Sequence, residues 1–185
     1  MKNFVVRTDV ISRIEDGEYT NEDLNTYLGW AINKYATDVI DSIINYPTFY
    51  LEYGFLDASH LNKLVFYNDY KWFKYFVDKV KIESFNSIGS FGYPPTNYGL
   101  MKDICWGNKI NFLKLIVDFP VEQLDFSRNE FVIVRETYKR KHYSILSMLL
   151  QRDEIKSNRK LYEKYSFILR GNKIKHLKEK IYIDK

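Results

Sequence analysis

Apolar residues recur along the chain as short blocks at nearly constant spacing. Each block has two apolar or weakly polar residues, a turn position three residues later, and a second apolar run that begins four or five residues after the turn. The clearest pair is WFKYFVD at 72–78 and FLKLIVD at 112–118, and the tetrapeptide Gly-Asn-Lys-Ile begins at both Gly107 and Gly171. This spacing predicts a repeated structural unit.

The turn positions define the period of the repeat. They fall at residues 35, 68, 108, 141 and 172, with separations of 33, 40, 33 and 31 residues. The one long interval contains KIESFNSIGSFGYPPTNYG at 81–99, whose Gly, Ser, Pro and Tyr content predicts an irregular inserted loop. Removing about seven residues there restores a period near 33.

Each unit is predicted to be a short helix, a tight turn and a more apolar second helix. The second helices are expected around 39–44, 72–77, 112–117 and 145–150. Asparagine stands at three of the five turn positions, and its side chain tolerates a left-handed backbone. Thr20 is predicted to begin the first helix, and Thr37 is predicted to be the N-cap of the second. Because one hairpin cannot cover its own apolar edge, several must stack.

In this register the chain resembles the ankyrin-repeat family, whose unit opens with Thr-Pro-Leu-His-x-Ala-Ala and has a Gly-His turn. The nearest openings are TYLGWAI at 26–32 and SHLNKLV at 59–65, and His142 matches the second turn residue. The proline and histidine of the opening are missing from every unit, and other residues replace the glycine of each turn.

The resemblance implies an all-α fold, an ankyrin-like helical-hairpin solenoid of about five degenerate repeats with one inserted loop. An N-terminal segment would occupy 1–19 and the repeat array 20–185, with the insertion at 81–99 and a basic C-terminal cap at 135–185. Two other architectures stay open, a different helical-hairpin array and a non-repetitive α-helical bundle.

Composition and charge restrict the cellular compartment and the kinds of partner that we expect. The chain has 185 residues, 16 Tyr, 13 Phe and 3 Trp, but one cysteine, which excludes an internal disulfide. The N-terminus lacks an apolar signal region, and no segment has the roughly 20 apolar residues of a membrane span. We therefore expect a cytoplasmic protein without a membrane partner. The part from Arg135 onward contains 15 Lys and Arg and 6 Asp and Glu. The part before it contains 13 Lys and Arg and 18 Asp and Glu.

No motif in the sequence specifies a reaction. Cys105 is expected to be a core thiol, and His60, His142 and His176 lack the spacing of metal ligands. The adjacent carboxylates Asp153 and Glu154 are expected to be surface charge. We therefore predict no catalytic residue, no metal site and no cofactor, and a non-enzymatic protein; an active site without a local motif is a third hypothesis.

Binding is better indicated than catalysis. In an ankyrin-like stack the two residues before each turn face the concave side. Exposed aromatic residues and arginines are enriched at interface hot spots, and long loops are often functional. The candidate partner-binding residues are Phe66, Tyr67, Trp106, Lys139, Arg140 and Arg170, with Phe91, Tyr93 and Tyr98 of the insertion. In the alternative interpretation, Phe66 and Trp106 pack against neighbouring helices and the insertion is disordered or a structural bridge.

Two functional hypotheses follow. The first is a protein–protein interaction module; because degenerate chains of this composition resemble the ankyrin-like proteins of large DNA viruses and phages, the partner would be a host factor that the protein binds and blocks. The alternative is a nucleic-acid-binding protein that uses the basic C-terminal part. Its phosphate-contacting and stacking residues would be Arg135, Lys139, Arg140, Lys141, Arg152, Arg159, Lys160, Tyr138, Tyr143 and Tyr162.

Overall fold

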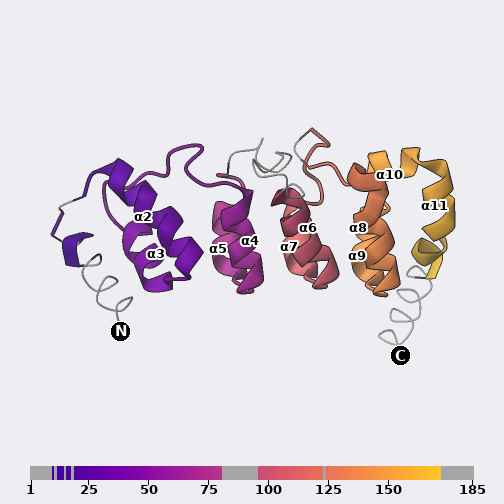
Figure 1. Ribbon diagram of the computed structural model, residues 1–185, viewed down its shortest axis with the longest axis horizontal. Helices are drawn as coiled ribbons and strands as arrows, with labels where there is room; N and C mark the ends of the chain where they lie inside the picture. The colour runs from indigo at the N-terminus through magenta and orange to yellow at the C-terminus, as the bar shows by residue number, and fades with distance from the viewer. Residues whose placement is uncertain are drawn as a thin grey trace, which may run out of the picture. The chain divides into compact units, whose positions relative to one another are not determined.

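The computed structural model describes residues 10–80 and 96–171 except residues 11, 15, 18 and 123, and no side chains are described for 96–98 and 128–129. The chain forms two compact units, unit 1 at Met1–Leu100 and unit 2 at Met101–Lys185. All regular secondary structure in the described residues is helical (Figure 1), which confirms the predicted all-α class.

Unit 1 contains two helical hairpins. In the first hairpin a short turn joins helix α2 (Asn21–Lys34) to α3 (Thr37–Ile44), and in the second it joins α4 (Ala58–Phe66) to α5 (Tyr70–Phe76). The helices of each hairpin pack together, and α2 also packs on α4. A longer loop at 45–57 connects the two hairpins.

Unit 2 repeats this organisation and extends it. The unit boundary falls within α6 (Thr96–Trp106), which is followed by α7, and the second hairpin is α8 with α9. Helices α7 and α9 pack together, as do the two short helices α10 and α11. The bounds of these elements are α7 (Ile110–Ile116), α8 (Arg128–Lys139), α9 (Tyr143–Leu149), α10 (Asp153–Ser157) and α11 (Arg159–Tyr165).

The four hairpins share one turn geometry. The residue at each predicted turn position has a left-handed backbone, with φ of 54° at Tyr35, 60° at Asn68, 55° at Asn108 and 61° at Lys141. The N–H of the next residue donates to the carbonyl five residues before it, the bond that defines a Schellman motif. These bonds are Ala36 to Ala31, Asp69 to Leu64, Lys109 to Ile104 and His142 to Thr137. Four predicted turns are therefore confirmed, and the fifth, at Asn172, lies outside the described residues.

The helix starts confirm one predicted cap and correct another. Thr20 is the N-cap of α2, and its hydroxyl and the Asp23 carboxylate form a capping box. Thr37 is not an N-cap, because it is the first residue of α3 and Ala36 precedes it without a side-chain bond. The cause is the turn itself: each second helix begins two residues after the left-handed residue, whichever side chain stands there.

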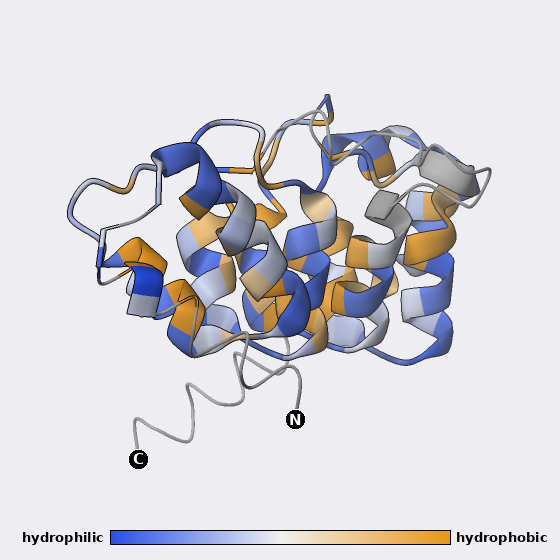
Figure 2. Ribbon diagram, turned by 60° about the vertical axis from the view of Figure 1, so that its left-hand side comes forward, coloured by the Kyte–Doolittle hydropathy of each residue, from blue (hydrophilic) through white to orange (hydrophobic). Residues whose placement is uncertain are grey.

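Equivalent positions in the four hairpins supply much of the core. The two residues four and five positions after each turn are buried, as are pairs such as Leu64 with Val65 in the first helices. Figure 2 shows helices that carry both hydrophobic and hydrophilic residues, as expected for helices with one buried stripe. The buried pairs of the second helices are Val39 with Ile40, Trp72 with Phe73, Phe112 with Leu113, and Ile145 with Leu146.

The predicted C-terminal boundary of the insertion is wrong by four residues. Residues 96–99, which the sequence placed in the loop, belong to α6. The Gly and Tyr of this stretch had indicated a loop, but their helix leads directly into the buried Leu100 and Met101, whose packing outweighs local propensity. Residues 81–95 lie outside the described part of the chain.

One core position of unit 2 is polar. Thr137 is fully buried where the other hairpins have Ala31, Leu64 and Ile104, and its hydroxyl has no hydrogen-bond partner among the described residues. Replacing Thr137 with valine keeps the shape of the side chain and removes the buried hydroxyl. We expect this variant to gain about 1 kcal/mol in the free energy of unfolding, measured by urea denaturation. A loss of stability would mean that the hydroxyl has a partner.

Candidate interaction surface

Three aromatic rings form a cluster at the turn end of unit 1. The rings of Tyr35 and Tyr67 stack with centroids 4.2 Å apart and an interplanar angle of 13°. Phe66 meets Tyr67 edge to face at 5.2 Å and 86°. The three residues, called here the aromatic turn cluster, come from both hairpins of the unit, so the packing of α4 beside α2 assembles them.

Hydrogen bonds hold the side chain of Tyr35, the ring on which Tyr67 stacks. The hydroxyl of Tyr35 donates to Oδ2 of Asp69 at 3.3 Å, and Oδ1 of Asp69 accepts from the backbone N–H of Trp72 at the start of α5. Burial, and then the charge of Asp69, raise the pKa of Tyr35, in keeping with a hydroxyl that donates to a carboxylate. The ring of Tyr35 is thereby held as a platform for Tyr67.

Phe66 is the outermost ring of the cluster. It is 68% exposed and Tyr67 is 40% exposed, whereas Leu64 and Val65 immediately before them are fully buried. Phe66 is therefore not part of the buried stripe of α4. Burying its ring against a partner would stabilise that contact by about 1.5–3 kcal/mol. An exposed phenylalanine that packs edge to face on a supporting ring is typical of interaction surfaces.

The loop between the hairpins of unit 1 carries two exposed tyrosines, Tyr50 and Tyr53, which do not belong to the aromatic turn cluster. Its backbone is held by the buried amide of Asn25, which donates to the carbonyl of Tyr50 at 3.0 Å and accepts from the N–H of Glu52 at 3.1 Å. Asn21 accepts from the N–H of Tyr50 at 3.0 Å. Sequence reasoning missed this loop; the signal was two asparagines one helical turn apart on a helix that otherwise buries apolar residues.

Unit 2 carries a different surface at its turn end. The indole of Trp106 is half-buried, with Nζ of Lys102 5.4 Å and the guanidinium carbon of Arg140 4.9 Å from the ring centroid. Nδ1 of His142 lies 3.0 Å from the carbonyl oxygen of Cys105, which joins the two turns of the unit. Lys139, Arg140 and Lys141 are exposed at the second turn. We call Lys102, Trp106, Lys139, Arg140 and Lys141 the basic turn surface.

The structure places the predicted binding residues in two groups. Phe66 and Tyr67 belong to the aromatic turn cluster, whereas Trp106, Lys139 and Arg140 belong to the basic turn surface. Trp106 is half-buried, which lies between its two predicted states. Of the remaining four, Arg170 is exposed near the end of the described chain, Tyr98 lies in α6 with its side chain outside the description, and Phe91 and Tyr93 fall within 81–95.

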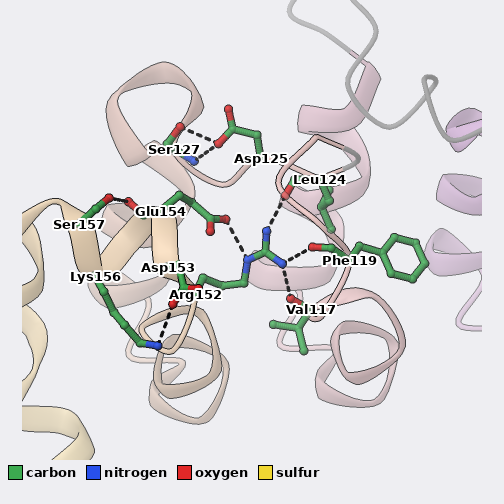
Figure 3. Close-up of polar contacts among 10 residues, drawn as sticks. All are labelled: Val117, Phe119, Leu124, Asp125, Ser127, Arg152, Asp153, Glu154, Lys156 and Ser157. Atoms are coloured by element: carbon green, nitrogen blue, oxygen red, sulfur yellow. Dashed lines mark hydrogen bonds and ion pairs between the residues drawn. The ribbon is translucent and has the colours of Figure 1, made fainter.

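Arg152 corrects two sequence-based assignments. It was expected to contact phosphate, but its side chain is 10% exposed and its guanidinium donates to the carbonyls of Val117, Phe119 and Leu124 (Figure 3). Its Nε donates to Oε1 of Glu154 at 2.8 Å, and Glu154, expected at the surface, is 13% exposed. The pair holds the loop that joins α7 to α8. Sequence reasoning missed this role, since the acceptors are backbone groups 28–35 residues away.

A pocket of about 490 Å³ lies beside this ion pair. Arg152 does not present a free charge to it, because the guanidinium already donates to four acceptors. The side chains around the pocket are mainly acidic or apolar. They include Val117, Asp118, Phe119, Asp153 and Glu154.

Cys105 has the environment of a core thiol. Its side chain is fully buried at the position of Ile32 and Val65 in the other hairpins, and burial raises the pKa of the thiol far above its usual value. A thiol in this state is a poor nucleophile. Among the described residues no group of three or more His, Cys, Asp or Glu side chains is placed to hold a metal ion. His176 lies outside the description.

Comparison of the chain with protein-family models, curated proteins and solved structures returned no match. In the part of the chain that the structure describes, no helix combines the length and the apolar character needed to cross a membrane.

Proposed function

We propose that the protein is a non-enzymatic protein–protein interaction module that binds its partner through the aromatic turn cluster of unit 1. The observation that carries this proposal is Phe66, an exposed phenylalanine supported by the stacked rings of Tyr67 and Tyr35. Because the three rings already contact one another, a partner that buries them restricts fewer side-chain rotamers than it would for isolated rings. Rings of this kind are typical binding hot spots.

The proposal includes the architecture. The common Schellman turn, the second helix that begins two residues after it and the matching buried positions support an ankyrin-like helical-hairpin repeat. Repeats of this type serve chiefly as binding scaffolds, and we assign the same role to this chain by analogy. The resemblance to viral and phage ankyrin-like chains extends the proposal to a host factor that the protein blocks.

A paired substitution tests the proposed surface. Phe66→Ser removes the outermost ring, and we expect it to reduce partner capture from the native cell about 30-fold, the effect of a hot spot worth about 2 kcal/mol. The matched control is Tyr53→Ser, because Tyr53 is 64% exposed in the same unit but lies on the loop between the hairpins. Mass spectrometry of the captured proteins gives the ratio for each variant.

The outcome separates the alternatives. Undiminished capture by Phe66→Ser, at an unchanged helical circular-dichroism signal, would refute the aromatic turn cluster as the binding surface. An equal loss for Tyr53→Ser would move the surface to the loop. The proposal requires loss with the first variant and near wild-type capture with the second.

A further inference from the structure

The basic turn surface of unit 2 has four cations, and among the described residues only Lys139 forms an ion pair, with Glu136. Glu136 accepts a 2.5 Å hydrogen bond from Nζ of Lys139, and this bond, with the charges of Lys139, Arg140 and Arg135, lowers the pKa of Glu136. Arg135 also pairs with Glu130, which leaves Lys102, Arg140 and Lys141 without an ion pair among the described residues. The surface therefore attracts anions.

Arg140 is the best-placed cation for a direct contact. Its guanidinium lies over the ring of Trp106, and no carboxylate of the described residues is within ion-pair distance of Arg140 or Lys141. A guanidinium held against an indole has lost part of its rotamer freedom before a ligand arrives. Its planar N–H donors match the two oxygens of a carboxylate.

We propose that the basic turn surface binds an acidic segment of a partner protein, with Arg140 taking a carboxylate and Lys102 and Lys141 flanking it. The inference deepens the proposed function and rests on it for the class of partner, but it concerns a separate surface in the other unit. Charge complementarity favours this ligand, because a short acidic segment can be bound by a few cations and one oriented guanidinium, and this surface provides both.

A nucleic acid fits this surface less well. Binding of a phosphate chain uses a row of uncommitted cations beside rings on which bases stack. Arg152 is committed to internal contacts, and Arg135, Lys139 and Arg159 are paired with Glu130, Glu136 and Glu163. Trp106, the ring at the centre, already has two cations over it.

The test uses fluorescein-labelled decaglutamate as the probe and the full chain at physiological ionic strength. We expect Arg140→Gln with Lys141→Gln to weaken the affinity about tenfold. Arg140→Lys, which keeps the charge and loses the planar fork, is expected to cost at least about threefold. The matched control, Arg159→Gln with Lys160→Gln, removes two exposed charges from the same unit and is expected to change the affinity less than about twofold.

Three results would overturn the inference. Equal losses for the two double variants would show that decaglutamate responds only to net charge. Tighter binding of the oligonucleotide dT10, lost with Arg140 and Lys141, would make the occupant a nucleic acid. Self-association of the unlabelled protein that depends on the same two residues would make it a second copy of the chain.

Failure of this inference is distinguishable from failure of the proposed function. The Phe66→Ser variant keeps the basic turn surface and is expected to bind decaglutamate like the wild type. Loss of partner capture by Phe66→Ser supports the proposed function, and a loss of decaglutamate binding confined to the Arg140 and Lys141 double variant supports the inference. Retained capture by Phe66→Ser would refute the function of the aromatic turn cluster while the decaglutamate results still decide the inference.

Discussion

Replacing Arg152 with alanine is expected to lower the free energy of unfolding of unit 2 by about 3–5 kcal/mol. The substitution leaves the largely buried carboxylate of Glu154 without its partner, and three backbone carbonyls of the loop after α7 lose their donor. Urea denaturation measures the total loss. Hydrogen exchange at 117–127 reports whether this loop opens first.

The matched control is Arg159→Ala. Arg159 is 90% exposed and pairs with Glu163 in the same unit, so we expect a change below about 0.5 kcal/mol. Arg152→Lys keeps the charge but has no planar fork to reach three carbonyls, and it is expected to be nearly as unstable as the alanine variant. If Arg152→Ala lost less than about 1 kcal/mol, the guanidinium would not hold the loop and this account of unit 2 would be wrong.

Replacing Asn25 with alanine is expected to cost about 3 kcal/mol in unit 1. Asn25 is fully buried, and its amide bonds to the carbonyls of Asn21 and Tyr50 and to the N–H of Glu52. Without that amide, the loop backbone must leave groups unpaired or move into water. Urea denaturation measures the cost, and faster hydrogen exchange at 50–52 locates it.

The control for this variant is Asn33→Ala on the same helix. Asn33 is exposed, and alanine is the better helix former, so we expect unchanged or slightly higher stability. Equal behaviour of the two alanine variants would mean that the loop at 45–57 does not depend on Asn25. A loss confined to Asn25→Ala would establish that one buried amide orders the loop with Tyr50 and Tyr53.

The turn positions could be predicted from the sequence because they depend on local constraints. A left-handed residue must follow each first helix at a fixed distance from the buried pair, and this spacing is visible even where Tyr35 and Lys141 replace asparagine. The apolar runs of the second helices were equally clear. Both signals lie within about ten residues of each other, so local pattern was enough.

The inter-hairpin loops could not be predicted from the same pattern. Asn25 reaches residues 25 and 27 positions away, and Arg152 reaches carbonyls up to 35 positions away. Backbone acceptors leave no trace in a sequence, so Arg152 was indistinguishable from the exposed cations near it. Its partner Glu154 was likewise indistinguishable from exposed Asp153.

Only the part of the candidate site that depends on local pattern could be predicted from the sequence. The position of Phe66 and Tyr67 before a turn indicated exposure, and their exposure is confirmed. The supporting role of Tyr35 and the guanidinium of Arg140 over Trp106 depend on the packing of one hairpin against the next. Such contacts follow from which side chains meet across two repeats, which the repeat pattern alone does not specify.

Site-specific photocrosslinking at the aromatic turn cluster tests the central claim most directly. The full chain would carry p-benzoylphenylalanine in place of Phe66, with the same photoreactive residue in place of Tyr53 as the control. We predict that position 66 forms a covalent adduct with a distinct partner protein in the native cell and that position 53 gives far less of it. No adduct at position 66, or equal amounts of one at both positions, would contradict the account.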